Sequence, residues 1–181
     1  MKKTLVLLLM LVVLLPSQAF AASVTTSYVE KLYFEGYKGS LKEVKTALNS
    51  LKPTQCKNVI LLAEKSKATV DRYKMAVKNK ASKEEIANAK AAIDADKKVL
   101  NAAKSSCSKS VRDIKQSINE NLKKINLEKT SLVKEIKGNL EGKDNRSKAE
   151  IDEYVKKRLN DIDNEFSNIL DSITRYRSEH F

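Results

Sequence analysis

Residues 56–107 read CKNVILLAEKSKATVDRYKMAVKNKASKEEIANAKAAIDADKKVLNAAKSSC, and this stretch decides the fold. Its two cysteines stand at equal distances from a turn signal at Ala81 and Ser82. Two helices folded back at this turn place at one level any two residues whose numbers sum to 163. The apolar pairs that meet this condition are Cys56 with Cys107, Ala63 with Leu100, Val70 with Ile93, and Val77 with Ile86. The stretch therefore predicts an antiparallel helical hairpin closed by a Cys56–Cys107 disulfide, with a pair of buried thiols as the alternative.

Composition favours helix along the rest of the chain. The sequence contains only four glycines and two prolines, the residues that most disfavour a helix interior. Helix starts are indicated by a serine followed three residues later by glutamate, because these two side chains can satisfy each other's backbone N–H groups. The pattern occurs at Ser27 with Glu30, Ser40 with Glu43, Ser82 with Glu85, and Ser147 with Glu150. We expect an all-α fold with helices over about 28–51 (one helix or two short ones), 54–79, 83–140 and 148–177.

The expected helix 83–140 is long enough to belong to two hairpins. Its apolar stripe continues to Leu140, and glycine and polar residues then predict a turn near Lys143. The stripe of the helix 148–177 pairs with it about this turn at a second constant sum, 287, as Ile125 does with Ile162. The sequence therefore predicts elongated, coiled-coil-like antiparallel hairpins that share one central helix, which is roughly 80 Å long at 1.5 Å per residue.

The segment 28–51 has two possible roles. Its apolar residues pair with those of helix 54–79 at sums near 104, which predicts three-helix packing around the disulfide. These pairs are Leu48 with Cys56, Val44 with Ile60, and Leu41 with Ala63. The alternative is self-association into a homo-oligomer, because a two-helix contact buries only a narrow stripe. In the first hairpin we also expect Lys67 and Asp96, which sum to 163, to form an ion pair that defines the register.

The first 21 residues have the features of a secretory signal peptide. Lys2 and Lys3 precede an apolar run, and small residues before Ala22 predict cleavage after Ala21. The run is shorter than the roughly 20 residues that span a bilayer. We therefore expect an exported chain of residues 22–181, periplasmic or extracellular, that forms a single elongated helical domain without a transmembrane segment. The oxidising compartment would favour the disulfide.

The charge is positive and unevenly placed. The chain has 35 basic and 23 acidic side chains, and the excess lies mainly in the first hairpin. Such a field attracts polyanions by a screened, unspecific force, and solvated helix faces are the alternative explanation. The candidate contacts for an anionic surface are Lys57, Lys65, Arg72, Lys74, Lys78, Lys104, Lys109 and Arg112.

The densest aromatic cluster lies near the start of the mature chain. It comprises Tyr28, Tyr33, Phe34 and Tyr37. Such a cluster either belongs to the core or forms a patch that binds a protein partner. The sequence leaves both interpretations open.

No pattern in the sequence predicts catalysis, a metal site or a cofactor. The single histidine, His180, cannot complete a zinc site of the usual kind with the two cysteines. Nucleic-acid binding is not expected either, because Tyr73 is the only aromatic residue of the basic hairpin that could stack on a base. We expect a non-enzymatic interaction or structural protein, adhesin- or scaffold-like, that binds proteins or an anionic envelope surface. The alternative is a periplasmic holdase chaperone for unfolded or envelope proteins.

Overall fold

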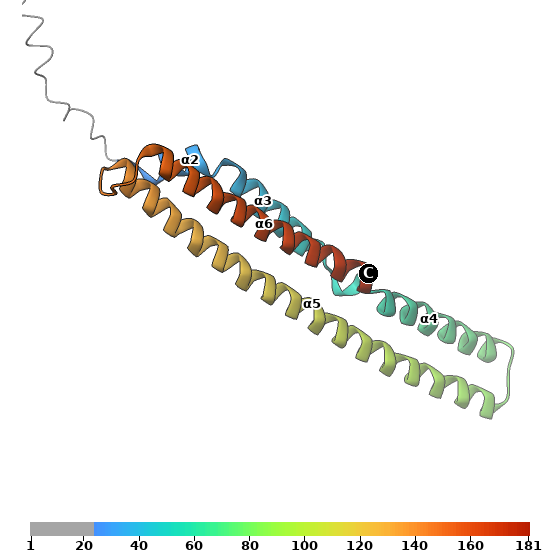
Figure 1. Cartoon of the computed structure of the whole chain (residues 1–181). Coiled ribbons are helices and arrows are strands. Elements are labelled where there is room, and N and C mark those ends of the chain that lie inside the picture. The colour runs from blue at the N-terminus through green and yellow to red at the C-terminus, as the bar shows by residue number, and fades with distance from the viewer. Residues whose placement is uncertain (1–23) are drawn as a thin grey trace, which may run out of the picture. The chain divides into compact units, whose positions relative to one another are not determined.

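The computed structural model describes residues 24–181, which form helices joined by short turns (Figure 1). The elements in chain order are α2 (Thr26–Tyr33), α3 (Glu35–Ser50), the short 3-10 helix η1 (Pro53–Gln55), α4 (Lys57–Lys78), α5 (Lys83–Leu140) and α6 (Lys148–His180). No strand occurs in this part of the chain, so the expected all-α fold is confirmed. The expected signal peptide lies outside the described residues.

The central helix α5 has 58 residues and is therefore about 87 Å long. It starts with the expected capping motif: the Ser82 N–H donates to Glu85 Oε2 at 2.8 Å, and the Glu85 N–H donates to Ser82 Oγ at 3.2 Å. Ser147 and Glu150 form the same motif at the start of α6. α5 ends shortly before Gly142, whose φ of 72° lies in the left-handed region that favours glycine.

Two of the expected start signals do not start a helix. Thr25 caps α2 in place of Ser27, since its Oγ1 accepts a hydrogen bond from the Tyr28 N–H at 3.2 Å. Ser40 lies inside α3, where its hydroxyl donates to the Gly36 carbonyl. The chain breaks between α2 and α3 at Phe34, whose ring is buried. The segment is thus two helices, separated where an aromatic ring enters the core.

The described residues form two compact units. The loop unit comprises residues 24–35 and Lys129–Arg158, and the hairpin unit comprises Gly36–Glu128 and Leu159–Phe181. α5 and α6 each contribute one segment to both units.

In the loop unit, α2 packs on the last turns of α5 and the first turns of α6. The buried core residues are Val29, Phe34, Leu132, Val133, Ile136, Ile151 and Val155. At the edge of this core, the Tyr33 hydroxyl donates to Asp152 Oδ1 at 2.9 Å, and Lys129 forms an ion pair with Glu30. Burial and this bond to Asp152 raise the pKa of Tyr33 to about 12.

In one part of the hairpin unit, three helices pack together: α3, α5 and α6. The buried residues are Tyr37, Val44, Leu48, Val111, Ile118, Leu122, Ile125, Ile162, Phe166, Ile169 and Ile173. The rings of Tyr37 and Phe166 meet edge to face at 5.4 Å between centroids. The Tyr176 hydroxyl donates to Ser110 Oγ at 2.8 Å, and these residue numbers sum to 286. This contact confirms the second register, which predicts 287.

In the other part of the hairpin unit, α4 and the first turns of α5 pair without a third helix. The Cys56–Cys107 disulfide closes this hairpin, with 6.6 Å between the Cα atoms. α6 ends beside it, where Lys57 Nζ donates to the Ser178 carbonyl at 2.9 Å. Between the cysteines, Val59 and Ile93 are the fully buried residues. The hairpin therefore has a thin seam and two outward faces.

Three helices do pack together, but the partners of α3 differ from those that the sums near 104 predict. Tyr37 contacts Phe166 of α6, and Leu48 lines a depression with Lys115 of α5. The expected α4 partner Ile60 is 44 % exposed. The reason is local: Pro53 ends a helix, as expected, but η1 then leads onward into α4 without reversing the chain (Figure 1).

Candidate interaction surface

A cavity of about 280 Å³ lies beside the disulfide and is lined by Lys57, Ser110, Tyr176 and His180, among others. Ser110 Oγ already accepts a hydrogen bond from the Tyr176 hydroxyl, and His180 Nε2 lies 4.0 Å from the carboxylate of its neighbour Glu179. A nucleophilic serine needs a base at hydrogen-bond distance, and this pocket does not place one beside Ser110. Within residues 24–181, no three His, Cys, Asp or Glu side chains form a group that could hold a metal ion.

The four aromatic residues of the N-terminal cluster differ in burial. Phe34 and Tyr37 are buried, and Tyr33 is half-buried with its hydroxyl bound to Asp152. Tyr28 is 56 % exposed, as is Leu32 one helical turn later. This burial favours the core interpretation for Phe34 and Tyr37, and it leaves Tyr28 as the member of the cluster that could touch a partner.

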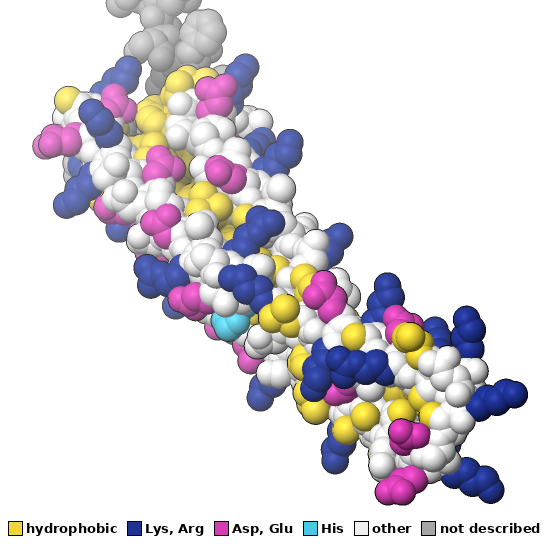
Figure 2. All heavy atoms as spheres, turned by 90° about the vertical axis from the view of Figure 1, so that its right-hand side faces the viewer, with side chains coloured by type: hydrophobic (Ala, Val, Ile, Leu, Met, Phe, Trp, Pro, Cys, Tyr) yellow, Lys and Arg dark blue, Asp and Glu magenta, His cyan; other side chains and the backbone are white. Residues whose placement is uncertain are grey.

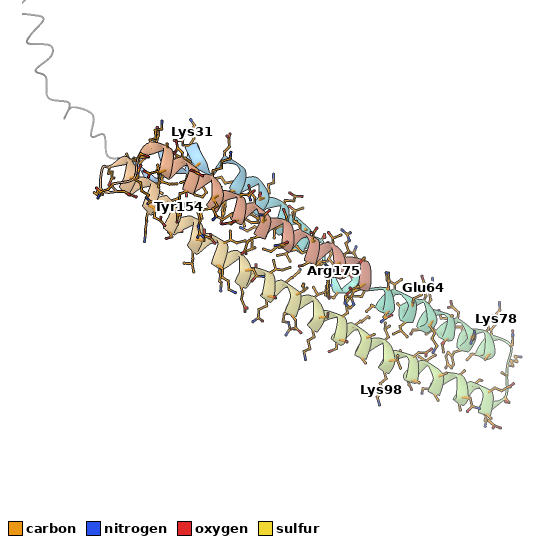
Figure 3. All side chains as sticks on the ribbon, in the orientation of Figure 1. Lys31, Glu64, Lys78, Lys98, Tyr154 and Arg175 are labelled. Atoms are coloured by element: carbon orange, nitrogen blue, oxygen red, sulfur yellow. A yellow bond between two sulfur atoms is a disulfide. The ribbon has the colours of Figure 1, made fainter. Side chains whose placement is uncertain are left out.

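The eight basic candidates do not share one face. Lys57 binds the Ser178 carbonyl, Lys65 pairs with Asp96 at 3.0 Å, and Lys74 pairs with Asp71 at 3.5 Å. The other five are exposed and make no ion pair with any described residue: Arg72, Lys78, Lys104, Lys109 and Arg112. Figure 3 shows that Lys78 projects from α4 on the side away from α5. These eight residues therefore do not form one continuous basic surface.

The seam of the α4/α5 hairpin contains a polar contact centred on Asp96. Asp96 accepts a hydrogen bond from the Thr69 hydroxyl at 2.6 Å and pairs with Lys65. These pairs sum to 165 and 161, which bracket 163, so the predicted level is correct. The predicted partner Lys67 is wrong, because it lies on another flank of α4. The bonds from Thr69 first, and then from Lys65, hold the pKa of the Asp96 carboxyl below its usual range.

The buried face of α4 is correspondingly rotated from the expected one. Val77 was expected at the seam opposite Ile86, but it is 47 % exposed. Leu62, Ser66 and Thr69 are half-buried, and so is Val70, which was expected at the seam opposite Ile93. The seam residues of α4 thus follow two series with a spacing of seven, one through Val59, Ser66 and Tyr73 and one through Leu62, Thr69 and Ala76.

One flank of this seam carries a row of lysines. On α5, lysines follow the seam residues Ile86, Ile93 and Leu100 by four positions, about 40° around the helix. On α4, the residues one position after Val59, Ser66 and Tyr73 lie about 100° around the helix from them, turned in the same direction as the lysines of α5. In an antiparallel pair of helices, residues that are turned in the same direction from the seam lie on the same side of the pair. We call this side the lysine face: Lys67, Lys74, Lys83, Lys90, Lys97 and Lys104, with Ile60, Ala63, Val70 and Val77 between them.

Positive charge outweighs negative charge on the lysine face. All six lysines are exposed, and of these only Lys74 makes an ion pair with a described residue, Asp71. Asp94 follows Ile93 by one position and lies on this side as well, whereas Asp96 lies in the seam and Glu85 on the opposite flank. Figure 3 shows Glu64 on the side of α4 away from α5. Lys67 with Lys97 and Lys74 with Lys90 each sum to 164, so like charges stand opposite each other at two levels.

The opposite flank is mainly apolar, and we call it the alanine face. It consists of Leu61, Ala68 and Met75 of α4 and Ala92, Ala95, Val99 and Ala102 of α5. Leu61, Met75 and Val99 are 62 %, 61 % and 50 % exposed. Lys65 and Arg72 lie beside these residues, near Asp96. Figure 2 shows exposed hydrophobic side chains, in yellow, among the basic side chains of the hairpin.

Sequence reasoning missed most of the lysine face, although a signal for it was present. Only Lys74 and Lys104 were among the eight candidates. The spacing of seven from Lys83 to Lys104 and the sums of 164 are readable in the sequence. Counting basic residues along each segment, without assigning them to a face of the helix, concealed the row.

Comparison with known proteins adds no identity: no family model, no curated protein and no solved structure matches the chain. None of the helices within residues 24–181 combines the length and the apolar character needed to cross a membrane.

Proposed function

We propose that the chain is an exported, non-enzymatic interaction protein, of scaffold or adhesin type, that binds an anionic envelope surface or a protein partner through the α4/α5 hairpin. The observation that carries this proposal is the lysine face. Five of its six lysines make no ion pair with a described residue, and a bound anionic partner would supply the missing counter-charge. The Cys56–Cys107 disulfide is compatible with a periplasmic or extracellular site, because disulfides persist in oxidising compartments.

Envelope binding tests this function directly. The mature chain, residues 22–181, is incubated with washed cell-envelope fractions over a range of protein and salt concentrations. We expect saturable binding that weakens as salt rises, because exposed charges are screened over about 8 Å at physiological ionic strength. Absence of saturable binding at low salt would contradict the proposed function.

The alanine face supports a second candidate, a holdase chaperone. Exposed Leu61 and Met75 offer an adaptable apolar surface, and basic side chains lie next to them. A holdase should suppress the aggregation of an unfolded client protein at near-stoichiometric ratio, and the double variant Leu61→Ser/Met75→Ser should lose this effect. If the wild-type chain leaves aggregation unchanged, the holdase candidate is rejected.

A further inference from the structure

We propose that the lysine face docks on the surface of a lipid bilayer rich in anionic phospholipid head groups. This inference rests on the proposed function and names its target. It concerns only the α4/α5 hairpin, whose lysine and alanine faces differ in chemistry. The lysine face is the side that would lie against the membrane.

The spacing of the lysines suits an extended surface of negative charges. Seven residues of helix correspond to about 10.5 Å, so the four lysines from Lys83 to Lys104 cover about 32 Å along α5. Lys67 and Lys74 form a second row on α4, opposite Lys97 and Lys90. The two antiparallel helices lie side by side and present these rows as a plane, which can bring all six ammonium groups close to a flat layer of phosphates at once.

The apolar residues of the same face favour a bilayer over a linear polyanion. Ile60 and Val77 are 44 % and 47 % exposed and lie among the lysines. Aliphatic side chains gain nothing from a hydrated polysaccharide or polyphosphate chain, but they are stabilised at the boundary between head groups and acyl chains. Lysine stems can extend past them and keep the ammonium groups at the phosphates.

The charge distribution also orients the hairpin. Residues 57–106 carry twelve basic and six acidic side chains. Of the acidic residues, Asp94 lies on the lysine side, Asp71 is bound by Lys74, and Asp96 is bound by Thr69 and Lys65. The six lysines therefore outnumber the carboxylates that would meet the negative surface when the lysine face is turned toward it. The side of α4 away from α5 carries Glu64 instead.

Vesicle flotation with matched variants tests the docking face. The mature chain is mixed with vesicles of phosphatidylglycerol and phosphatidylcholine, or of phosphatidylcholine alone. The face variant is Lys83→Gln/Lys90→Gln/Lys97→Gln/Lys104→Gln. The control variant Lys78→Gln/Lys98→Gln/Lys109→Gln/Lys123→Gln removes the same charge from exposed positions outside the face. Circular dichroism verifies that both variants keep the helical content of the wild type.

A lysine near an anionic membrane contributes about fivefold in affinity, so the face variant should lose more than about a hundredfold. The control should lose less than about tenfold, because its lysines lie outside the face that meets the lipid and contribute only through screened charge. Equal losses in both variants would show that only net charge matters and would overturn the proposal. Failure of the wild type to float with the anionic vesicles would also overturn it. Envelope binding by the same preparation would then leave the proposed function intact.

Fluorescence distinguishes a bilayer from a linear polyanion. The chain contains no tryptophan, so a single tryptophan reports its own site. Val77→Trp on the lysine face should shift its emission to the blue with anionic vesicles, whereas Leu61→Trp on the alanine face should not. Competition by polyphosphate without any shift for Val77→Trp would identify a polymer as the ligand and overturn the lipid proposal. A shift at Leu61→Trp alone would overturn the choice of face.

Discussion

The Thr69 hydroxyl donates a 2.6 Å hydrogen bond to the Asp96 carboxylate across the seam of the α4/α5 hairpin. Lys65 pairs with the same carboxylate from one helical turn earlier. A polar layer in an otherwise apolar seam disfavours other registers, because a shift leaves its members without partners. Asp96 therefore defines which residues of α4 and α5 face each other, and with them the lysine face.

The first prediction concerns the acidity of Asp96. Its pKa is held below the ordinary range by Thr69 first and Lys65 second. Thr69→Val and Lys65→Met should each raise the Asp96 pKa, and Lys67→Met should leave it nearly unchanged. An NMR titration of the Asp96 carboxyl carbon measures this. A larger effect of Lys67→Met than of Lys65→Met would refute the rotation of α4 described above.

The second prediction follows from the same lowered pKa. A carboxyl whose pKa is lower in the folded state stabilises the fold above its unfolded-state pKa, and this stabilisation is lost as pH falls through the folded-state value. Stability should therefore fall on acidification below the ordinary range for aspartate. Asp96→Asn should be less stable than the wild type at neutral pH but should lose less on acidification. Chemical denaturation at several pH values checks this, and parallel curves for the two proteins would contradict it.

The third prediction concerns the disulfide. Cys56 and Cys107 are 51 residues apart, and closing a loop of this size stabilises a fold by about 4 kcal/mol in the chain-entropy account. Cys56→Ser/Cys107→Ser should lower the free energy of unfolding by about that amount, measured by urea denaturation. The reductant control should destabilise the wild type and leave the double variant unchanged. Recovery of both thiols free by non-reducing peptide mapping of the wild type would contradict the account.

The fourth prediction concerns the three-helix part of the hairpin unit. Phe166 is 2 % exposed and meets Tyr37 edge to face, so Phe166→Ala should cost about 3–5 kcal/mol of stability. Leu127 is 70 % exposed, and Leu127→Ala is the matched control, expected to change stability by no more than about 0.5 kcal/mol. Thermal and urea unfolding provide the measurement. Similar small effects for both would mean that α3 and α6 do not pack as described.

Much of the fold could be predicted from the sequence because long helices repeat their signals. The bounds of α5, the two capping motifs at Ser82 and Ser147, and the cysteine pair each depend on residues close together in sequence or on a constant sum. The level of Asp96 was likewise correct. A constant sum gives the level at which two residues of antiparallel helices face each other. That level stays correct when the rotation of a helix about its axis is assigned slightly wrongly.

Rotation and direction could not be predicted in the same way. A residue and its neighbour differ by 100° around a helix but by only 1.5 Å along it, so the sum of 163 could not choose between Lys65 and Lys67. Pro53 predicts the end of a helix but not the direction of the next one, and the segment 28–51 was therefore assigned to the wrong neighbour. Because rotation about the helix axis was not assigned, the basic candidates lie on several faces, and four of the six lysines of the lysine face are not among them.

The measurement that tests the account most directly is zero-length carbodiimide coupling of the mature chain followed by peptide mapping. It joins amines to carboxylates that are already in contact. The account predicts a Lys65–Asp96 crosslink in the hairpin unit and a Glu30–Lys129 crosslink in the loop unit. Dominant crosslinks between Lys67 and Asp96 would contradict it, and so would crosslinks between Lys42 and Glu64, whose sum of 106 is close to the 104 of a folded-back N-terminal segment.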